Sequence, residues 1–301
     1  MSNFFVKFAV MFVVATVSLA AHGNSYVNKI RKEAESGDVE AQFALGVRYY
    51  FGKGVKKDYA EAFSWFSKAA EKEHMKAEYN LGVCFYYGKG VEKNFVKAVS
   101  WYKKAAEKGF PDAQYNLGKC FYLGEGVNKD PQQAMNWFRK AADKKFAKAQ
   151  YTLGNIYYWT KSDSTTGVYW YKKAAELGHA DAQFQLGKCY AIGTGVSQDE
   201  WEAKSWLNKA STKRHIKAEA LFSSLNSFDT KQGREEKISE WTNEYHHMRN
   251  CSNYCPVKNL HNCSFESSRT GFRQSVPFIH YRQENRFNRK NNRSRTRGIR
   301  L

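Results

Sequence analysis

The chain has 301 residues, of which 42% are hydrophobic and 16% aromatic, and it contains only 4 prolines. This composition suits packed helices that carry large side chains, and it excludes disorder of the whole chain. The formal net charge is +19, and the residues from His246 onward contribute +10 of it, with 12 lysines and arginines against 2 acidic residues. Such a tail favours a polyanion or an anionic membrane surface as partner, and a solvated tail with no fixed partner is the alternative.

Residues 1–22 have the features of a secretory signal peptide. Lys7 lies before an apolar run of 12 residues from Phe8 to Leu19, and small residues follow at the positions that a signal peptidase needs. The run is shorter than the roughly 20 residues of a membrane span, although Phe4 and Phe5 lengthen it enough to keep an uncleaved anchor as the alternative. We therefore expect an exported protein, periplasmic or secreted in a bacterium, or in the lumen of the endoplasmic reticulum in a eukaryote.

A six-residue motif returns along the chain at nearly constant spacing. It begins at Ala41 as Ala-Gln-Phe-Ala-Leu-Gly, and its later copies start 36, 36, 36 and 33 residues further on each time, at Ala77, Ala113, Ala149 and Ala182. Self-similarity at this period predicts a solenoid, in which each unit packs only on its neighbours. Because solenoids present extended surfaces, the repeat favours a binding protein over an enzyme.

Each unit reads as two helices joined by a glycine turn. Ala41, Leu45 and Tyr49 share one face of the first helix, and Gly52 and Gly54 then stop it. The second helices are expected to begin at residues that cap free amides: Asp58, Asn94, Asp130 and Asp199. Two columns are expected to hold the repeats together, a Leu-Gly pair and a buried tryptophan: Leu45, Gly46, Leu81, Gly82, Leu117, Gly118, Trp65, Trp101, Trp137, Trp170 and Trp206.

The spaced pattern Ala-x3-Leu-Gly-x2-Tyr-x2-Gly-x-Gly-Val-x2-Asp-x3-Ala-x2-Trp-Phe-x2-Ala-Ala, which recurs from Asp38 to Ala210, resembles the Sel-1-like repeat family, relatives of the tetratricopeptide repeats. The resemblance implies an all-α fold, a right-handed superhelical solenoid of antiparallel helix pairs that acts as an adaptor or receptor surface. Some cysteine-rich bacterial relatives are described as binding or slowly hydrolysing β-lactams. Those relatives pair two cysteines within one repeat, whereas a repeat of this chain holds at most one.

The solenoid is predicted to span residues 25–226, and one repeat departs from the pattern. The predicted segments are a capping helix at 25–36, repeats at 38–73, 74–109, 110–145, 146–178 and 179–214, a partial repeat at 215–226, a C-terminal capping helix at 227–248 and a basic, disordered tail at 249–301. In repeat four, Leu153 to Trp170 spans 17 residues where Leu45 to Trp65 spans 20, and no double glycine is present. A remodelled turn is expected there, with a functional loop as the alternative.

Three cysteines occupy one column of the repeats, three residues after the leucine: Cys84, Cys120 and Cys189. Equivalent points on stacked helices lie about 10 Å apart, farther than the roughly 7 Å between α-carbons that a disulfide allows. These thiols are therefore expected to be unpaired and partly buried.

A column of varying side chains on the first helices is the candidate groove for a partner. Its members are Asn80, Asn116, Thr152 and Gln185, with Tyr87 and Trp159 continuing the stripe. Amides can hold a peptide backbone through donor and acceptor together, and aromatic residues anchor interfaces. The alternative is that these aromatic residues merely pack between repeats.

The sequence offers no convincing catalytic set, cofactor motif or small-molecule substrate site, and the Gly-x-Gly pairs are explained as helix stops. A His and Cys cluster in the tail, from His246 to Cys263, has zinc-ligand chemistry but matches no known finger spacing, so disulfides or disorder are the alternatives. The leading hypothesis is an exported, non-enzymatic scaffold that binds a protein or peptide through its concave surface. The rivals are a β-lactam-binding or β-lactamase-like enzyme and a polyanion- or envelope-binding protein acting through its tail.

Overall fold

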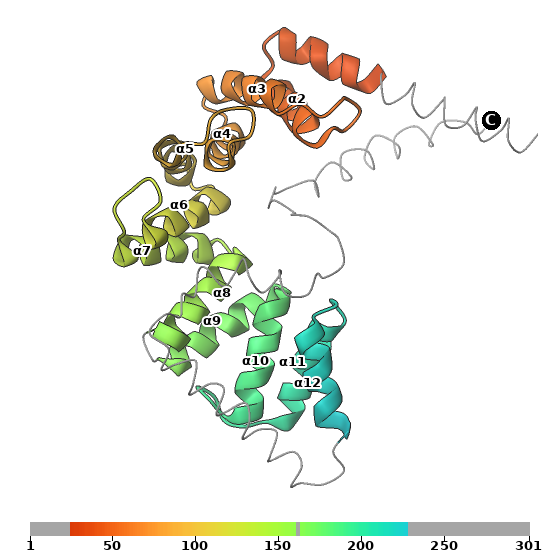
Figure 1. Cartoon of the computed structure of the whole chain (residues 1–301). Coiled ribbons are helices and arrows are strands. Elements are labelled where there is room, and N and C mark those ends of the chain that lie inside the picture. The colour runs from red at the N-terminus through yellow and green to blue at the C-terminus, as the bar shows by residue number, and fades with distance from the viewer. Residues whose placement is uncertain (1–24, 161–162, 228–301) are drawn as a thin grey trace, which may run out of the picture. The chain divides into compact units, whose positions relative to one another are not determined.

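The computed structural model describes residues 25–160 and 163–227, and every regular element among them is helical. A helix over residues 25–35 comes first (Figure 1). The labelled helices follow in chain order: α2 (Val39–Phe51), α3 (Tyr59–Glu71), α4 (Met75–Tyr87), α5 (Phe95–Glu107), α6 (Pro111–Leu123), α7 (Pro131–Asp143), α8 (Ala147–Asn155), η1 (Ile156–Thr160), α9 (Ser164–Glu176), α10 (Ala180–Ile192), α11 (Glu200–Ser211) and α12 (Ile216–Ser227). The predicted signal peptide, the predicted capping helix beyond Ser227 and the tail lie outside the described residues.

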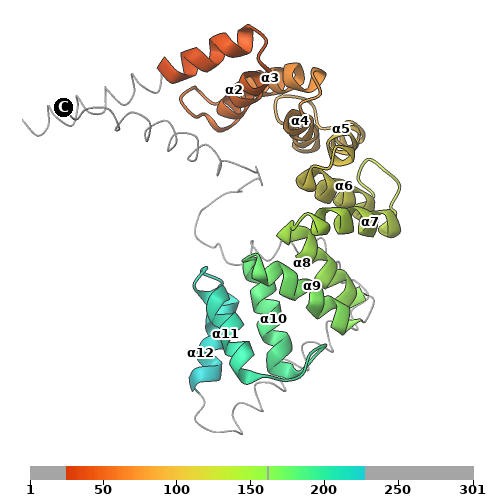
Figure 2. The ribbon, with the colours of Figure 1, turned by 180° about the vertical axis from the view of Figure 1, so that it is seen from behind.

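Each helix packs against its neighbours in the chain, so that the pairs α2/α3, α4/α5, α6/α7, α8/α9 and α10/α11 follow one another (Figures 1 and 2). The two helices of each pair run antiparallel and form a hairpin (Figure 1). The second helix of one pair contacts the first helix of the next. The predicted all-α solenoid of helix pairs is confirmed.

The predicted helix boundaries are confirmed at both kinds of helix. The first helices end at glycines in the left-handed conformation, such as Gly52 with φ +71° and Gly88 with φ +66°, which favours residues without a β-carbon. The second glycine of the turn packs on the preceding repeat, because a β-carbon at Gly90 would collide with the carbonyl of Tyr59. The predicted caps accept backbone hydrogen bonds, as where Asp58 accepts from the amide of Ala60 at 2.9 Å.

The centre of each repeat is a glycine facing a large side chain. The leucine of the Leu-Gly pair is fully buried, and a β-carbon on the glycine would lie 2.5 Å from the Tyr102 ring at Gly82 and 2.7 Å from the Phe66 ring at Gly46. The facing residues, all fully buried, come directly after each tryptophan: Phe66, Tyr102, Phe138, Tyr171 and Leu207. The absence of a β-carbon therefore lets the two helices of a pair come into close contact.

The prediction of a buried tryptophan is correct for Trp65 and Trp206, each 9% exposed, and wrong for Trp101, Trp137 and Trp170, which are half-buried. A helix turns by about 100° per residue, so the residue after the tryptophan points at the glycine and the tryptophan lies at the edge of the core. A lysine three residues later covers four of the rings, for example Lys104 with its Nζ 4.1 Å from the Trp101 centroid.

Two sets of hydrogen bonds connect neighbouring repeats. In four repeats, the alanine that begins the six-residue motif is followed by a buried glutamine. The Nε2 of this glutamine donates to a carbonyl of the preceding second helix, as from Gln114 to Ala106 at 3.0 Å. A lysine just after the second helix donates to a carbonyl 35 residues earlier, as from Lys144 to Gly109 at 2.7 Å. These bonds fix the stacking of the units.

Repeat four keeps the core but not the turn. Its first helix passes into the π-helix η1, and Asp163 then caps α9 by accepting from the amide of Thr166 at 3.0 Å. The predicted remodelled turn is confirmed. α9 also approaches η1 closely. The regular repeats have an alanine at the position of Gly167, but a β-carbon at Gly167 would lie 2.7 Å from the β-carbon of Tyr158.

Cys84, Cys120 and Cys189 are unpaired and buried, as predicted. Burial raises the pKa of each thiol to about 12, because the thiolate would lose its solvation. These cysteines are therefore structural residues with little thiolate at neutral pH.

Candidate binding face

The predicted groove residues lie at equivalent positions of consecutive first helices, or of η1 for Trp159, and we call these positions the first-helix face: Asn80, Asn116, Thr152, Gln185, Tyr87 and Trp159. Their exposure differs. Tyr87 is 37% exposed and Asn116 and Gln185 are half-buried, whereas Asn80, Thr152 and Trp159 are at most 7% exposed. The accessible part of this face therefore consists of Tyr87, Asn116 and Gln185.

Two members of the column also join neighbouring repeats. Asn116 Nδ2 donates to the Tyr79 hydroxyl at 3.3 Å, and the Thr152 side chain lies near the Tyr115 hydroxyl one repeat further on. Thr152 Oγ1 also donates to the carbonyl of Lys148 at 2.9 Å. The sequence alone could not show whether these polar side chains contact a neighbouring repeat or a ligand, because a column of polar residues is expected in both cases.

Asp112, which the sequence analysis did not single out, is a buried carboxylate on this face. It lies at the start of α6 and is 4% exposed, and its Oδ1 has no hydrogen-bond partner among the described residues. Burial raises the pKa of Asp112 to about 7, against the opposing effect of the nearby Lys148 ammonium. The pattern that precedes it, a proline at the first helical position, indicates only a helix start.

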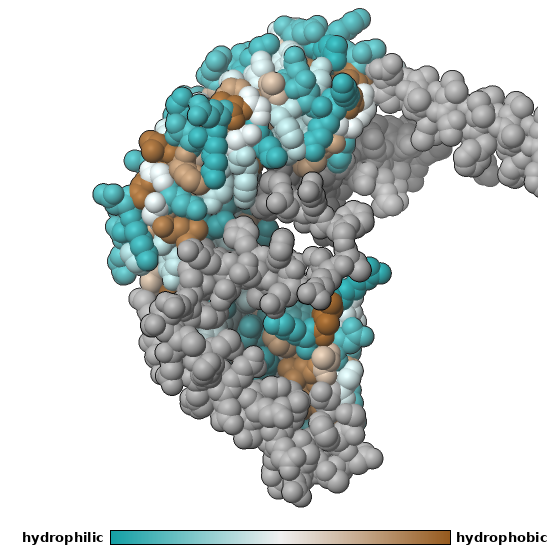
Figure 3. All heavy atoms as spheres, viewed as in Figure 1, coloured by the Kyte–Doolittle hydropathy of each residue, from teal (hydrophilic) through white to brown (hydrophobic). Residues whose placement is uncertain are grey.

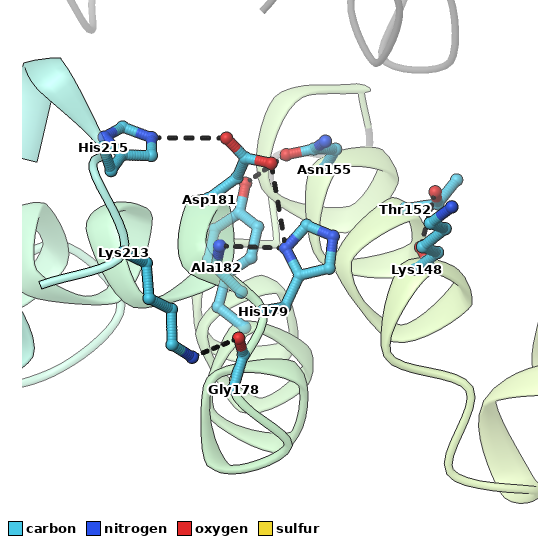
Figure 4. A network of polar contacts seen from close by, with 10 residues as sticks. Lys148, Thr152, Asn155, Gly178, His179, Asp181, Ala182, Lys213 and His215 are labelled. Carbon is cyan, nitrogen blue, oxygen red and sulfur yellow. Dashed lines mark hydrogen bonds and ion pairs between the residues drawn. The ribbon is translucent and has the colours of Figure 1, made fainter. Parts of the chain in front are cut away.

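Histidines begin three of the first helices and accept backbone hydrogen bonds there. Figure 4 shows His179, whose Nδ1 accepts from the amide of Ala182 at 3.3 Å, and His215, whose Nε2 lies 3.2 Å from Asp181 Oδ1. The His179 ring stacks on Tyr151 at 4.7 Å between centroids. Burial lowers the pKa of His179 to about 4, so its imidazole is neutral at pH 7 and can accept the capping hydrogen bond.

The described residues contain no group of three or more His, Cys, Asp or Glu side chains placed to hold a metal ion. The His and Cys cluster from His246 to Cys263 lies outside them. None of the helices in the described residues has the length and hydropathy of a membrane span. In the view of Figure 3, the coloured hydrophobic residues form separate patches among hydrophilic ones. The first-helix face is the candidate binding site that follows from the repeat pattern.

The comparisons with known proteins agree with this architecture. A model of the Sel1 repeat matches residues 39–74, 76–110, 111–146, 147–179 and 180–215. The chain is similar to a solved Sel1 repeat protein from Oxalobacter formigenes (35% identity, TM-score 0.63, 66% of this chain and 58% of that one). It is also similar to a protective antigen of uropathogenic Escherichia coli (32% identity, TM-score 0.62, 80% of this chain and 48% of that one).

Among curated proteins, the secretory immunoglobulin A-binding protein EsiB of Escherichia coli is 44% identical over 55 residues, which are 18% of this chain and 11% of EsiB. The chain therefore spans about a tenth of EsiB and about half of each of the two solved relatives. The five family matches cover more than half of the chain, and they fall on the helix pairs that share the glycine-facing core. The protein belongs to the Sel1 repeat family.

Proposed function

We propose that the protein is an exported scaffold that binds a protein or peptide partner through the first-helix face. The observation that carries the proposal is the contrast between columns of the repeat. The leucine and glycine columns hardly change, whereas the accessible positions of the first-helix face differ from repeat to repeat, as with Asn116 and Gln185. A framework that is constant around a surface that varies is what specific recognition of a partner needs.

The side chains on this face have the chemistry of peptide recognition. Tyr87 packs edge-on against Tyr86, with centroids 4.8 Å apart, which holds its ring at the surface without a large loss of side-chain entropy on binding. The half-buried amides of Asn116 and Gln185 can donate to and accept from a peptide backbone. EsiB, by its name, binds an immunoglobulin, which supports a protein partner here and makes secretory immunoglobulin A a defined probe.

Selection of phage-displayed peptides on the full chain tests this function. We expect selected peptides to bind at least about tenfold more weakly after Tyr87→Ala, the loss of one aromatic anchor. Tyr169→Ala is the matched control, because Tyr169 is a 53% exposed tyrosine on the second helix α9 and should not matter. Equal loss in both variants, or no effect of Tyr87→Ala, would show that peptides bind elsewhere.

The absence of catalysis is part of the proposal. The rival enzyme function predicts turnover of nitrocefin by the purified protein. We expect no turnover that survives repurification and disappears after a single side-chain substitution.

Binding of polyanions or of anionic membranes by the tail, residues 249–301, is a second activity that its charge supports. Deletion of these residues should weaken heparin binding and leave the melting of the repeats unchanged.

A further inference from the structure

The turns between first and second helices have a strong positive charge in repeats one and two. We call residues 52–61 and 88–97 the basic turn edge. These two segments contain six lysines against three acidic residues: Lys53, Lys56, Lys57, Lys89, Lys93 and Lys97. One of the three carboxylates, Asp58, is engaged as a helix cap, since its Oδ1 accepts hydrogen bonds from the amides of Ala60 and Glu61. The two segments therefore carry a net charge of +3.

The fold itself does not require these lysines. The matching segments of repeats three and five, residues 124–133 and 193–202, contain one lysine against five acidic residues. Their turns have the same backbone, with φ +76° at Gly124 and φ +69° at Gly193 against +71° at Gly52. Because the same turn forms with opposite charge, the lysines of repeats one and two are explained by something other than folding.

Aromatic rings contact several of these ammonium groups. Lys57 Nζ lies 4.7 Å and Lys89 Nζ 4.9 Å from the centroid of Tyr59, although the two lysines belong to adjacent repeats. One repeat further on, Lys93 Nζ lies 4.4 Å from the centroid of Phe95. In repeats three and five the ring is replaced by a proline and by Glu200, which pairs with Lys204 at 2.8 Å.

The lysines around these rings are held without a carboxylate partner. Lys57, Lys89 and Lys93 form no ion pair with any residue in the part of the chain that the structure describes. Cations placed on rings and close to one another create a positive potential that an anionic ligand can relieve. Because the charges run across two repeats, the ligand that fits is a polymer with spaced anionic groups rather than a single small ion.

We propose that the basic turn edge binds an acidic polysaccharide. The aromatic faces of Tyr59 and Phe95 are covered by ammonium groups, so they are not open platforms for the stacking of nucleobases, which is how proteins bind single-stranded nucleic acid. The cations are lysines, whose compact charges suit separate sulfate or carboxylate groups without the planar paired geometry of arginine. This activity is separate from the first-helix face and does not depend on it.

Heparin binding by the full chain tests the proposal. In the test variant, four lysines of the basic turn edge become glutamine: Lys56, Lys57, Lys89 and Lys93. In the control variant, four exposed lysines elsewhere become glutamine: Lys103, Lys145, Lys172 and Lys217. Both variants lose the same charge and keep the tail, so the contribution of the tail is the same in both. Circular dichroism and thermal melting of each variant establish that it is folded.

We expect the test variant to bind heparin about tenfold more weakly at 0.1 M salt and with a salt dependence flatter by about 2 to 4 in slope, because fewer counterions are released. The control variant should bind within about twofold of the unmodified protein. Equal loss in both folded variants would overturn the proposal, since net charge alone would then explain binding. Tighter binding of the unmodified protein to single-stranded DNA or to phosphatidylglycerol vesicles than to heparin, lost in the test variant, would overturn the assignment to a polysaccharide.

Discussion

Repeats two and four reach the same core through different turns. In repeat two, α4 ends at Gly88 in the left-handed conformation, whereas in repeat four α8 continues as the π-helix η1 and the sequence between η1 and α9 contains no glycine. The core contact is nevertheless the same, because a β-carbon at Gly82 or at Gly154 would lie 2.5 Å from the ring of the facing tyrosine. The contact between glycine and ring therefore defines the repeat, and the turn can change as long as α9 returns to that contact.

The largest expected effect is on the core that both repeats share. Tyr102→Ala and Tyr171→Ala should each lower the free energy of unfolding by about 3 to 5 kcal/mol, because each removes a fully buried ring. Trp101→Ala should cost less, about 1 to 2 kcal/mol, because Trp101 is half-buried. Urea unfolding measures all three. If Trp101→Ala proved the most costly of the three, the assignment of the core to the residue after the tryptophan would be wrong.

Much of this arrangement could be predicted from the sequence, and the reason for the rest is physical. The glycine stops and the caps at Asp58, Asn94, Asp130 and Asp199 depend on local backbone chemistry, which a short motif encodes. The bond from Gln114 to Ala106 and the lysine contacts 35 residues apart depend on how repeats stack, which no local pattern reports. For the same reason the sequence could not show that the groove residue Thr152 is buried between repeats.

The repeats also differ in the residue that begins the first helix, which is Phe146 in repeat four and the titratable His179 in repeat five. The free energy of unfolding should therefore depend on pH through His179. The pKa of His179 is lowered to about 4, so its contribution to stability is lost as pH falls from about 6.5 toward 4. The pKa of Asp112 is raised to about 7, so Asp112 destabilises the fold at neutral pH and this cost disappears as pH falls toward 4.

The two contributions oppose each other, and single variants separate them. Relative to the unmodified protein, His179→Phe should gain on the order of 2 to 4 kcal/mol as pH falls from 7 to 4, and Asp112→Asn should lose a similar amount. Urea unfolding at pH 4, 5.5 and 7 measures both slopes relative to the unmodified protein. Identical slopes in the two variants would contradict the assigned environments.

The close approach of α9 to η1 gives a smaller effect that is specific to repeat four. Gly167→Ala should destabilise the protein by about 1 to 3 kcal/mol, because the new methyl group meets the backbone of Tyr158. The reverse change in repeat two, Ala98→Gly, should cost about 1 kcal/mol through helix propensity and lost packing. Thermal melting compares them. A stabilising Gly167→Ala would show that η1 does not pack on α9 in this way.

The smallest effect concerns the second residue after each second helix. Repeats two and four have Gly109 and Gly178 there, whereas repeat three has Lys145 at φ +60°, a conformation unfavourable for a residue with a β-carbon. Lys145→Gly should therefore stabilise the protein by about 0.5 to 1 kcal/mol, and Gly178→Ala should destabilise it by a similar amount. Differential scanning calorimetry should resolve the two opposite shifts in melting temperature, and shifts of the same sign would contradict this reading of the turn.

The central claim is that the framework of the repeats is separable from the side chains of the first-helix face that bind a partner. The most direct measurement is the melting temperature and the peptide affinity of one variant that combines Tyr87→Ala, Asn116→Ala and Gln185→Ala. We expect peptide binding to be lost while the melting temperature changes by only a few degrees, since the variant loses the hydrogen bond from Asn116 to Tyr79 but keeps the glycine-facing core. A collapse of the cooperative melt, or full peptide affinity in the folded variant, would contradict the claim.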